Sequence, residues 1–128
     1  MIALPAIPRK KRILVVEDEA DSGDLLAHAL GAQYDVVVAR DGMEGVERAA
    51  EWQPDLVISD VSMPRLSGLD MVRHLRRKQG LKAPVIFITA LNAPGDIIAG
   101  ISAGARHYLR KPVEFDDLKK KVARALGQ

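Results

Sequence analysis

The feature that most constrains the fold is an alternation of short apolar runs with segments that have helical spacing. The runs occupy residues 13–16, 34–39, 55–59, 84–89 and 107–109. Most of them are continuously apolar and rich in Val and Ile, as expected of strands buried on both faces. This alternation predicts βαβ units, so we expect an α/β fold with a doubly wound, five-stranded parallel sheet and five flanking helices.

The length and the composition fit one domain. The chain has 128 residues, of which 48% are hydrophobic, so we expect one core within residues 12–127 and a flexible basic tail over residues 1–11. There is no cysteine, which excludes disulfides, thiolate metal sites and a cysteine nucleophile. No apolar run has the roughly eighteen residues of a membrane span, and the start lacks the charge order of a signal peptide. We therefore expect a cytoplasmic protein.

Positive charge is clustered in three stretches, RKKR at 9–12, RHLRRK at 73–78 and KKK at 119–121. The net charge is only +2, and no aromatic residues alternate with these basic ones. A single-strand stacking surface needs such aromatic residues. The pattern therefore favours solvated helix faces and a solvated tail over direct nucleic-acid binding by this domain alone.

The expected helix ends carry recognisable signals. Asp41 and Glu44 have the spacing of a capping box, with Asp41 as N-cap and Glu44 reaching back. Three glycines stand where helices should close with a left-handed backbone: Gly31, Gly80 and Gly104. The last helix, residues 114–126, should turn three residues toward the sheet at helical spacing: Leu118, Val122 and Leu126.

Chemically active residues stand at the ends of four predicted strands, and open α/β sheets bind ligands at that edge. They are Glu17 and Asp18, Asp60, Thr89, and Lys111. The run at 34–39 is followed by Arg40, which is most simply a solvated charge. If that strand lies at the edge of the sheet, the other four ends become neighbours. Right-handed crossovers then give the order 2-1-3-4-5, a known order for doubly wound sheets.

Each of these residues has an ordinary explanation when taken alone. Asp18 can cap a helix, Thr89 is a good strand former, and Lys111 can be a surface charge. Three carboxylates brought together, however, repel by about 4 kcal/mol per pair at 4 Å and an effective dielectric near 20. One lysine cannot offset that repulsion, and a hard divalent cation can. We therefore expect Mg²⁺ with several retained waters.

A carboxylate that is held by Mg²⁺ and flanked by a lysine and a hydroxyl is equipped for phosphoryl transfer. Asp60 would be the nucleophile, because carboxylates serve as such in aspartyl-phosphate chemistry. The stretch DLVISDVSMPRLSG, residues 55–68, delivers Asp60 at a strand end. Pro64 disfavours helix at Met63, and we expect Gly68 to begin the next helix with a positive φ.

Four motifs in order resemble the receiver domains of bacterial two-component response regulators. They are ILVVEDE, DLVISDVSMPRLSG, FITA and GARHYLRKPVEFDDL, and the resemblance covers residues 12–127. It implies a chemotaxis-regulator-like domain of flavodoxin-like fold. It also implies a phosphorylation-dependent switch that takes part in its own phosphorylation and dephosphorylation, rather than an enzyme with a separate substrate.

The resemblance implies a role for each site residue. Asp60 would accept a phosphoryl group from a sensor histidine kinase or a phosphotransfer protein. Direct Mg²⁺ ligands would be Asp18, Asp60 and the backbone carbonyl of Ser62, with Glu17 acting through water. Lys111 and Thr89 would contact the phosphoryl group, and the Lys111–Pro112 bond would be cis.

Thr89 and Tyr108 would form the switch that alters the surface of the fourth helix, fifth strand and fifth helix and so regulates a downstream partner or output domain. From the residues alone, Tyr108 is equally well a strand residue that fills a gap between helix and sheet. Leu91 cannot orient a water molecule, so the resemblance further implies no fast hydrolysis assisted from that position.

Other readings of the strand-end carboxylate fit less well. A haloacid-dehalogenase-like phosphatase wants a second aspartate two residues after the nucleophile, where this chain has Ser62. A small nucleotide- or flavin-binding domain should have a Gly-rich or hydroxyl-rich loop after the first strand, where this chain has EDEAD. A pseudo-receiver is excluded only by the presence of every key residue. The sequence ends at ALGQ, which leaves open both a single-domain regulator and part of a longer protein.

Overall fold

The computed structural model describes residues 9–90 and 105–128. The strands are β1 (Arg12–Val16), β2 (Asp35–Ala39), β3 (Leu56–Asp60), β4 (Val85–Thr89) and β5 (Ala105–Arg110). The helices are α1 (Ala20–Leu30), α2 (Gly42–Trp52), α3 (Gly68–Lys78) and α5 (Phe115–Ala125). The expected fourth helix, with Leu91 and Gly104, lies outside the described residues. No helix in the described ranges has the length and apolar character needed to cross a bilayer.

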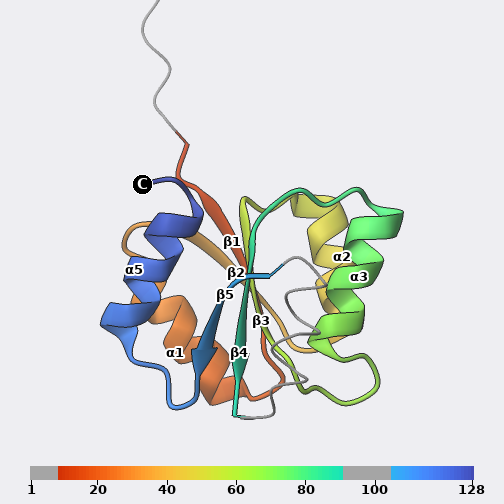
Figure 1. The fold of residues 1–128 in the computed structure, drawn as a ribbon, viewed down its shortest axis with the longest axis horizontal. Helices are drawn as coiled ribbons and strands as arrows, with labels where there is room; N and C mark the ends of the chain where they lie inside the picture. The colour runs from red at the N-terminus through yellow and green to blue at the C-terminus, as the bar shows by residue number, and fades with distance from the viewer. Residues whose placement is uncertain (1–8, 91–104) are drawn as a thin grey trace, which may run out of the picture.

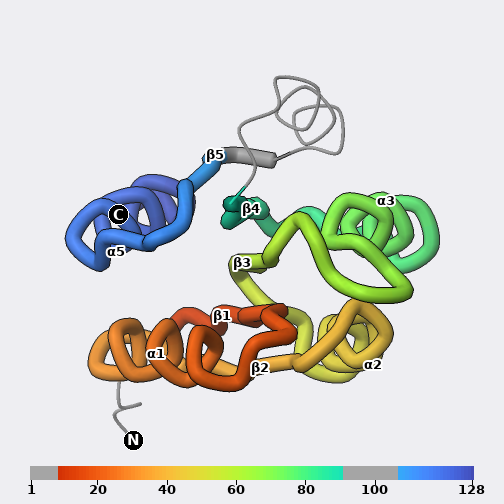
Figure 2. The backbone as a smooth tube through the Cα atoms, turned by 90° about the horizontal axis from the view of Figure 1, so that it is seen from below, coloured from red at the N-terminus to blue at the C-terminus, as the bar shows by residue number. Residues whose placement is uncertain are grey.

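The five strands form one parallel sheet in the order β2-β1-β3-β4-β5, as expected from the sequence. Helices α1 and α5 cover one face of the sheet, and α2 and α3 cover the other (Figure 1). The view from below shows the same three layers, with the sheet between the two pairs of helices (Figure 2). The carboxyl ends of all five strands therefore meet at one edge.

Successive strand residues alternate between two cores, because side chains along a strand point to opposite faces. In β1, Leu14 and Val16 join the core under α2 and α3, while Ile13 and Val15 join the core under α1 and α5. Every residue of β3 and β4 is buried, whereas β2 is half exposed at the edge of the sheet. The continuous apolar runs thus mark the central strands.

The α2 cap confirms most of the expected capping box. The Asp41 side chain accepts a hydrogen bond from the Glu44 N–H at 2.8 Å. The Glu44 carboxylate does reach back, but it accepts from the Arg40 N–H at 3.1 Å, one residue before the N-cap. The reciprocal bond is therefore displaced by one residue toward the end of β2.

The glycines at the helix ends differ from one another. Gly80 has the expected positive φ of 64°, directly after the α3 C-cap. The expectation for Gly31 is wrong, because its φ is −67° and the chain continues there in a right-handed turn. That turn is held by the Tyr34 N–H, which donates to the Leu30 carbonyl at 3.0 Å.

The end of α5 is tied to the start of β2. Leu118 and Val122 are buried against the sheet as expected, and Leu126 packs on the same core. Beyond the helix, Gly127 has a φ of 74° and the Gln128 N–H donates to the Ala123 carbonyl, which closes the helix in a Schellman motif. The Tyr34 hydroxyl donates to Gln128 Oε1 at 2.8 Å.

Candidate functional site

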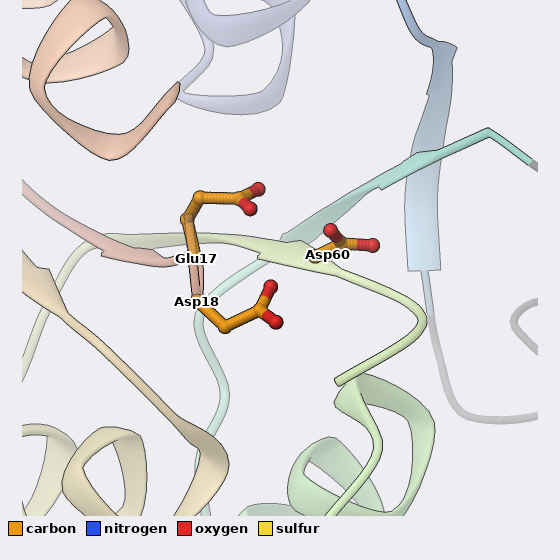
Figure 3. A group of neighbouring side chains, drawn as sticks. All are labelled: Glu17, Asp18 and Asp60. Atoms are coloured by element: carbon orange, nitrogen blue, oxygen red, sulfur yellow. The ribbon is translucent and has the colours of Figure 1, made fainter. Parts of the chain in front are cut away.

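Three carboxylates converge at the carboxyl edge of the sheet. Glu17 and Asp18 follow β1, and Asp60 is the last residue of β3. One carboxylate oxygen from each lies within 4.8 Å of the other two. Figure 3 shows the three side chains gathered around a common space. Glu17 and Asp60 are only 1% and 6% exposed, whereas Asp18 is open to solvent.

Lys111 brings a cation into this cluster from the end of β5. Its Nζ lies 2.7 Å from Asp60 Oδ2 and 3.5 Å from Glu17 Oε2. The backbone is also fixed there, because the Lys111 N–H donates to the Thr89 carbonyl at 3.0 Å. The Lys111–Pro112 peptide bond is cis, as the family resemblance implied.

The charges of the site influence one another. Burial raises the pKa of Glu17, and the charges of Asp60 and Asp18 add to that rise, against the opposing effects of the Glu19 N–H and Lys111. Burial alone would lower the pKa of Lys111, but the hydrogen bond to Asp60 and the charges of Asp60 and Glu17 raise it overall. Lys111 therefore stays cationic at neutral pH.

The site has a surplus of negative charge, since one lysine faces three carboxylates within the described residues. All the converging donors are oxygens, which are the ligands that hard divalent cations such as Mg²⁺ prefer. Asp18, the exposed member, leaves one side open for the water molecules that Mg²⁺ retains. The residues present thus fit such an ion.

The loop between β3 and α3 orients Asp60. The Ser62 N–H donates to Asp60 Oδ1 at 3.1 Å, so each carboxylate oxygen has its own partner. Gly68 does not have the expected positive φ; in this loop the positive φ, 70°, belongs to Arg65. Gly68 is needed for a different reason, because a Cβ there would stand 2.0 Å from the Asp60 carbonyl oxygen.

Thr89 and Tyr108 share one face of the sheet. Thr89 is 4% exposed and ends β4, two residues after Phe87 and so on the same face. Tyr108 lies opposite Phe87 in the β4–β5 register, and the ring centroids are 5.9 Å apart. The half-buried Tyr108 ring packs against the core under α2 and α3. The two residues of the expected switch thus belong to neighbouring strands.

A hollow beside the carboxylates was not predicted from the sequence. It has a volume of about 240 Å³ and lies between α1 and the segment from Lys111 to Phe115. Leu25 and Phe115 line it and are 56% and 38% exposed. The signal available in the sequence was an apolar residue at each of two helix positions, Leu25 and Phe115, that the core does not bury.

Arg40 is exposed, as expected of a solvated charge, but its guanidinium also has partners on α1. Its guanidinium lies 3.2 Å from Asp24 Oδ1 and donates to the Ala20 carbonyl at 3.3 Å. It therefore joins the end of β2 to the first turns of α1.

Comparison with known proteins agrees with this geometry. A family model described as response regulator receiver domain matches residues 13–123. The chain is 38% identical over 120 residues to the "Uncharacterized transcriptional regulatory protein YkoG" of Bacillus subtilis, covering 93% of this chain and 52% of that protein. It is 39% identical over 112 residues to the response regulator MprA of Mycobacterium leprae, covering 87% and 49%. The chain thus spans about half the length of the curated relatives it matches.

Solved structures with the same fold include the chemotaxis protein CheY4 of Vibrio cholerae. That structure superposes with a TM-score of 0.85 and 31% identity, covering 91% of this chain and 98% of the other. The receiver domain of the Francisella response regulator 1452 gives a TM-score of 0.84 and 29% identity, with 91% and 97% covered. Both matches extend over nearly the whole of each chain.

Proposed function

This chain belongs to the response regulator receiver domain family, and from that membership we propose that it is a signalling switch phosphorylated on Asp60. The observation that carries the proposal is the contact of 2.7 Å between Lys111 Nζ and Asp60 Oδ2 inside a cluster of carboxylates. A cation held on one oxygen of a buried nucleophile suits the transfer of an anionic group.

The chain's oxygens would hold Mg²⁺ at the carboxylate cluster. Asp18 and Asp60 would bind it directly together with the backbone carbonyl of Ser62, and Glu17 would act through a water molecule. When bound, Mg²⁺ supplies positive charge that neutralises phosphoryl oxygens during transfer. The buried Glu17 then serves mainly to fix the bound water and the Lys111 ammonium.

In the transfer step, a carboxylate oxygen of Asp60 attacks the phosphorus of a phosphohistidine on the partner protein. The phosphorus–nitrogen bond breaks, its electron pair stays on the imidazole nitrogen, and Asp60 becomes an acyl phosphate. Lys111 then exchanges its contact with Asp60 Oδ2 for one with a phosphoryl oxygen, and the Thr89 hydroxyl donates to another. Both contacts exist only in the phosphorylated state, so they can shift a conformational equilibrium.

The switch would pass from Thr89 to Tyr108 through the face of the sheet that both residues share. If Thr89 moves toward the phosphoryl group, space opens on this face beside Phe87, and the Tyr108 ring can turn into it. The surface that changes would comprise β5, α5 and the segment between β4 and β5, and it would regulate a downstream protein or an output domain.

The exposed apolar pair Leu25 and Phe115 indicates where the phosphodonor would dock. Both residues line the hollow that also contacts Glu17 and Lys111, so a protein seated there would reach Asp60. We assign this surface to the sensor histidine kinase or phosphotransfer protein. We also propose that the protein is cytoplasmic.

Intact-mass analysis after treatment with a small phosphodonor and Mg²⁺ tests the proposal. The wild type should gain one phosphate and Asp60→Ala should gain none. The matched control is Asp70→Ala, which removes an exposed carboxylate from α3 and should gain phosphate like the wild type. Equal gain in Asp60→Ala would move the acceptor to another residue.

A further inference from the structure

The turn between β2 and α2, residues 40–42, contacts the start of α1, which follows Glu17 and Asp18, and the β3–α3 loop, which follows Asp60. We call it the 40–42 turn. Strand β2 itself contributes no residue to the cluster, because the converging oxygens follow β1 and β3. The turn nevertheless bonds to the start of α1 through Arg40 and to the β3–α3 loop through Asp41, and Gly42 packs against the same loop.

On the first side, Arg40 fixes the segment that follows Asp18. Its guanidinium bonds the Ala20 carbonyl and Asp24 at the start of α1. It also lies beside Gly23, where an added Cβ would make ordinary contacts at 3.4 Å with Arg40 Nη1 and at 3.7 Å with Glu17 Cβ. The arginine and the buried glutamate therefore lie against the same turn of α1.

On the second side, Asp41 and Gly42 fix the loop that follows Asp60. Asp41 uses Oδ1 to cap α2 and Oδ2 to pair with the Arg65 guanidinium at 3.4 Å. Gly42 lies directly under Leu66, since a Cβ at Gly42 would stand 2.8 Å from the Leu66 carbonyl oxygen. Arg65 holds a positive φ of 70°, a backbone conformation that needs support from its surroundings.

We propose that the 40–42 turn is a brace that sets the separation of Asp18 from Asp60 and thereby the affinity for the divalent cation. The inference rests on the proposed function, because it assigns positioning residues to that metal site. Arg40 holds the start of α1, just after Asp18, and the Asp41–Arg65 pair holds the loop just after Asp60. Direct pairing of β1 with β3 fixes the chain as far as Val16 and Ser59. The turn adds a constraint on the carboxylates beyond that pairing, although it carries no ligand itself.

The proposal can be tested because substitution of Arg40 or Arg65 should change the Mg²⁺ affinity in opposite directions, depending on whether these residues act through their charge or through their contacts. Arg40 and Arg65 are cations near a cation site, so their removal should raise Mg²⁺ affinity if they act only through their charge. If they act as parts of the brace, Arg40→Gln and Arg65→Gln should each lower the affinity. Changes to groups that orient metal ligands commonly cost tenfold or more, and for these partly exposed contacts we expect about threefold to tenfold.

The experiment is a Mg²⁺ titration of the whole chain, followed by the NMR amide shifts of Asp60 and Ser62. Arg73→Gln is the matched control, because Arg73 makes a similarly exposed ion pair, at 3.2 Å with Asp70, within α3. Its affinity should equal that of the wild type. Arg40→Lys keeps the charge but loses the two-point contact of the guanidinium, so it should also bind Mg²⁺ more weakly.

The double variant Arg40→Gln with Arg65→Gln distinguishes a brace from two local contacts. The two contacts act in series, so breaking either one releases the tie, and the double variant should bind Mg²⁺ as well as the weaker single variant. Multiplied losses, or unchanged or tighter binding in either single variant, would overturn the brace while leaving the metal site intact. No Mg²⁺ binding by the wild type would overturn the metal site and the brace together.

Discussion

The sharpest test of the Asp60 geometry is the substitution Gly68→Ala. A Cβ at Gly68 would lie 2.0 Å from the Asp60 carbonyl oxygen and 2.7 Å from Ser59 Oγ. The first contact is about 1 Å shorter than a Cβ tolerates, and it is made with backbone at the end of β3, which cannot move aside as a side chain can. Overpacking that a flexible side chain cannot absorb should lower the free energy of unfolding by about 3 kcal/mol.

Gly45→Ala provides a matched comparison from α2. A Cβ at Gly45 would lie 2.6 Å from Met71 Sδ, in a flexible but buried side chain, and 3.1 Å from Val16 Cγ2, so both neighbours are side chains and not backbone. Moving the thioether off its rotamer costs about 1 kcal/mol, and replacing a mid-helix glycine by alanine regains about 1 kcal/mol. The free energy of unfolding should therefore change by less than about 1 kcal/mol in this variant.

Urea unfolding followed by circular dichroism measures both variants, with the midpoint and the slope compared with the wild type. A third variant, Gly68→Asn, separates the contact from the backbone conformation. If a left-handed backbone were the reason for glycine, asparagine would be tolerated better than alanine. The contact predicts that asparagine is at least as harmful. A smaller loss in Gly68→Ala than in Gly45→Ala would refute the reasoning.

Two further predictions concern single groups. Burial raises the pKa of Glu17 above its ordinary 4.5, so its contribution to stability is full below pH 4.5 and is lost as the pH rises through the folded-state pKa. Without Mg²⁺, the unfolding free energy of the wild type minus that of Glu17→Gln should therefore fall above pH 4.5, and a constant difference would contradict this. Tyr34→Phe removes the hydrogen bond to Gln128 and should cost about 1 kcal/mol in urea unfolding, with Gln128→Ala adding nothing further.

The sequence predicted the sheet well because burial on both faces leaves a clear pattern. The runs at 13–16, 55–59 and 84–89 lie within one residue of β1, β3 and β4. The run at 107–109 was too short by three residues, since β5 begins at Ala105 and ends at Arg110. That strand contains two arginines and a histidine and lies at the edge of the sheet, so its apolar pattern is weaker.

The predictions for the glycines show which features local sequence rules can predict and which they cannot. Gly80 could be placed from the helix pattern alone, because a left-handed residue after a helix is a local requirement. We expected a glycine at position 68 because of a positive φ. The glycine is needed instead because the start of α3 lies against the Asp60 carbonyl oxygen and leaves no room for a Cβ. Contacts of this kind depend on the position of a helix relative to the sheet, and residue spacing in a single sequence does not predict that position.

The same limit explains why Glu17, Asp18, Asp60 and Lys111 could be grouped in advance and Arg40 could not. Parallel strands place their carboxyl ends at one edge, so residues that follow buried strands become neighbours by topology alone. The partners of Arg40 are a carbonyl and a carboxylate in α1, and they reach it only because α1 packs against β2. A charged residue after an edge strand therefore looks solvated in the sequence, although this edge strand places it where it can hold a ligand loop.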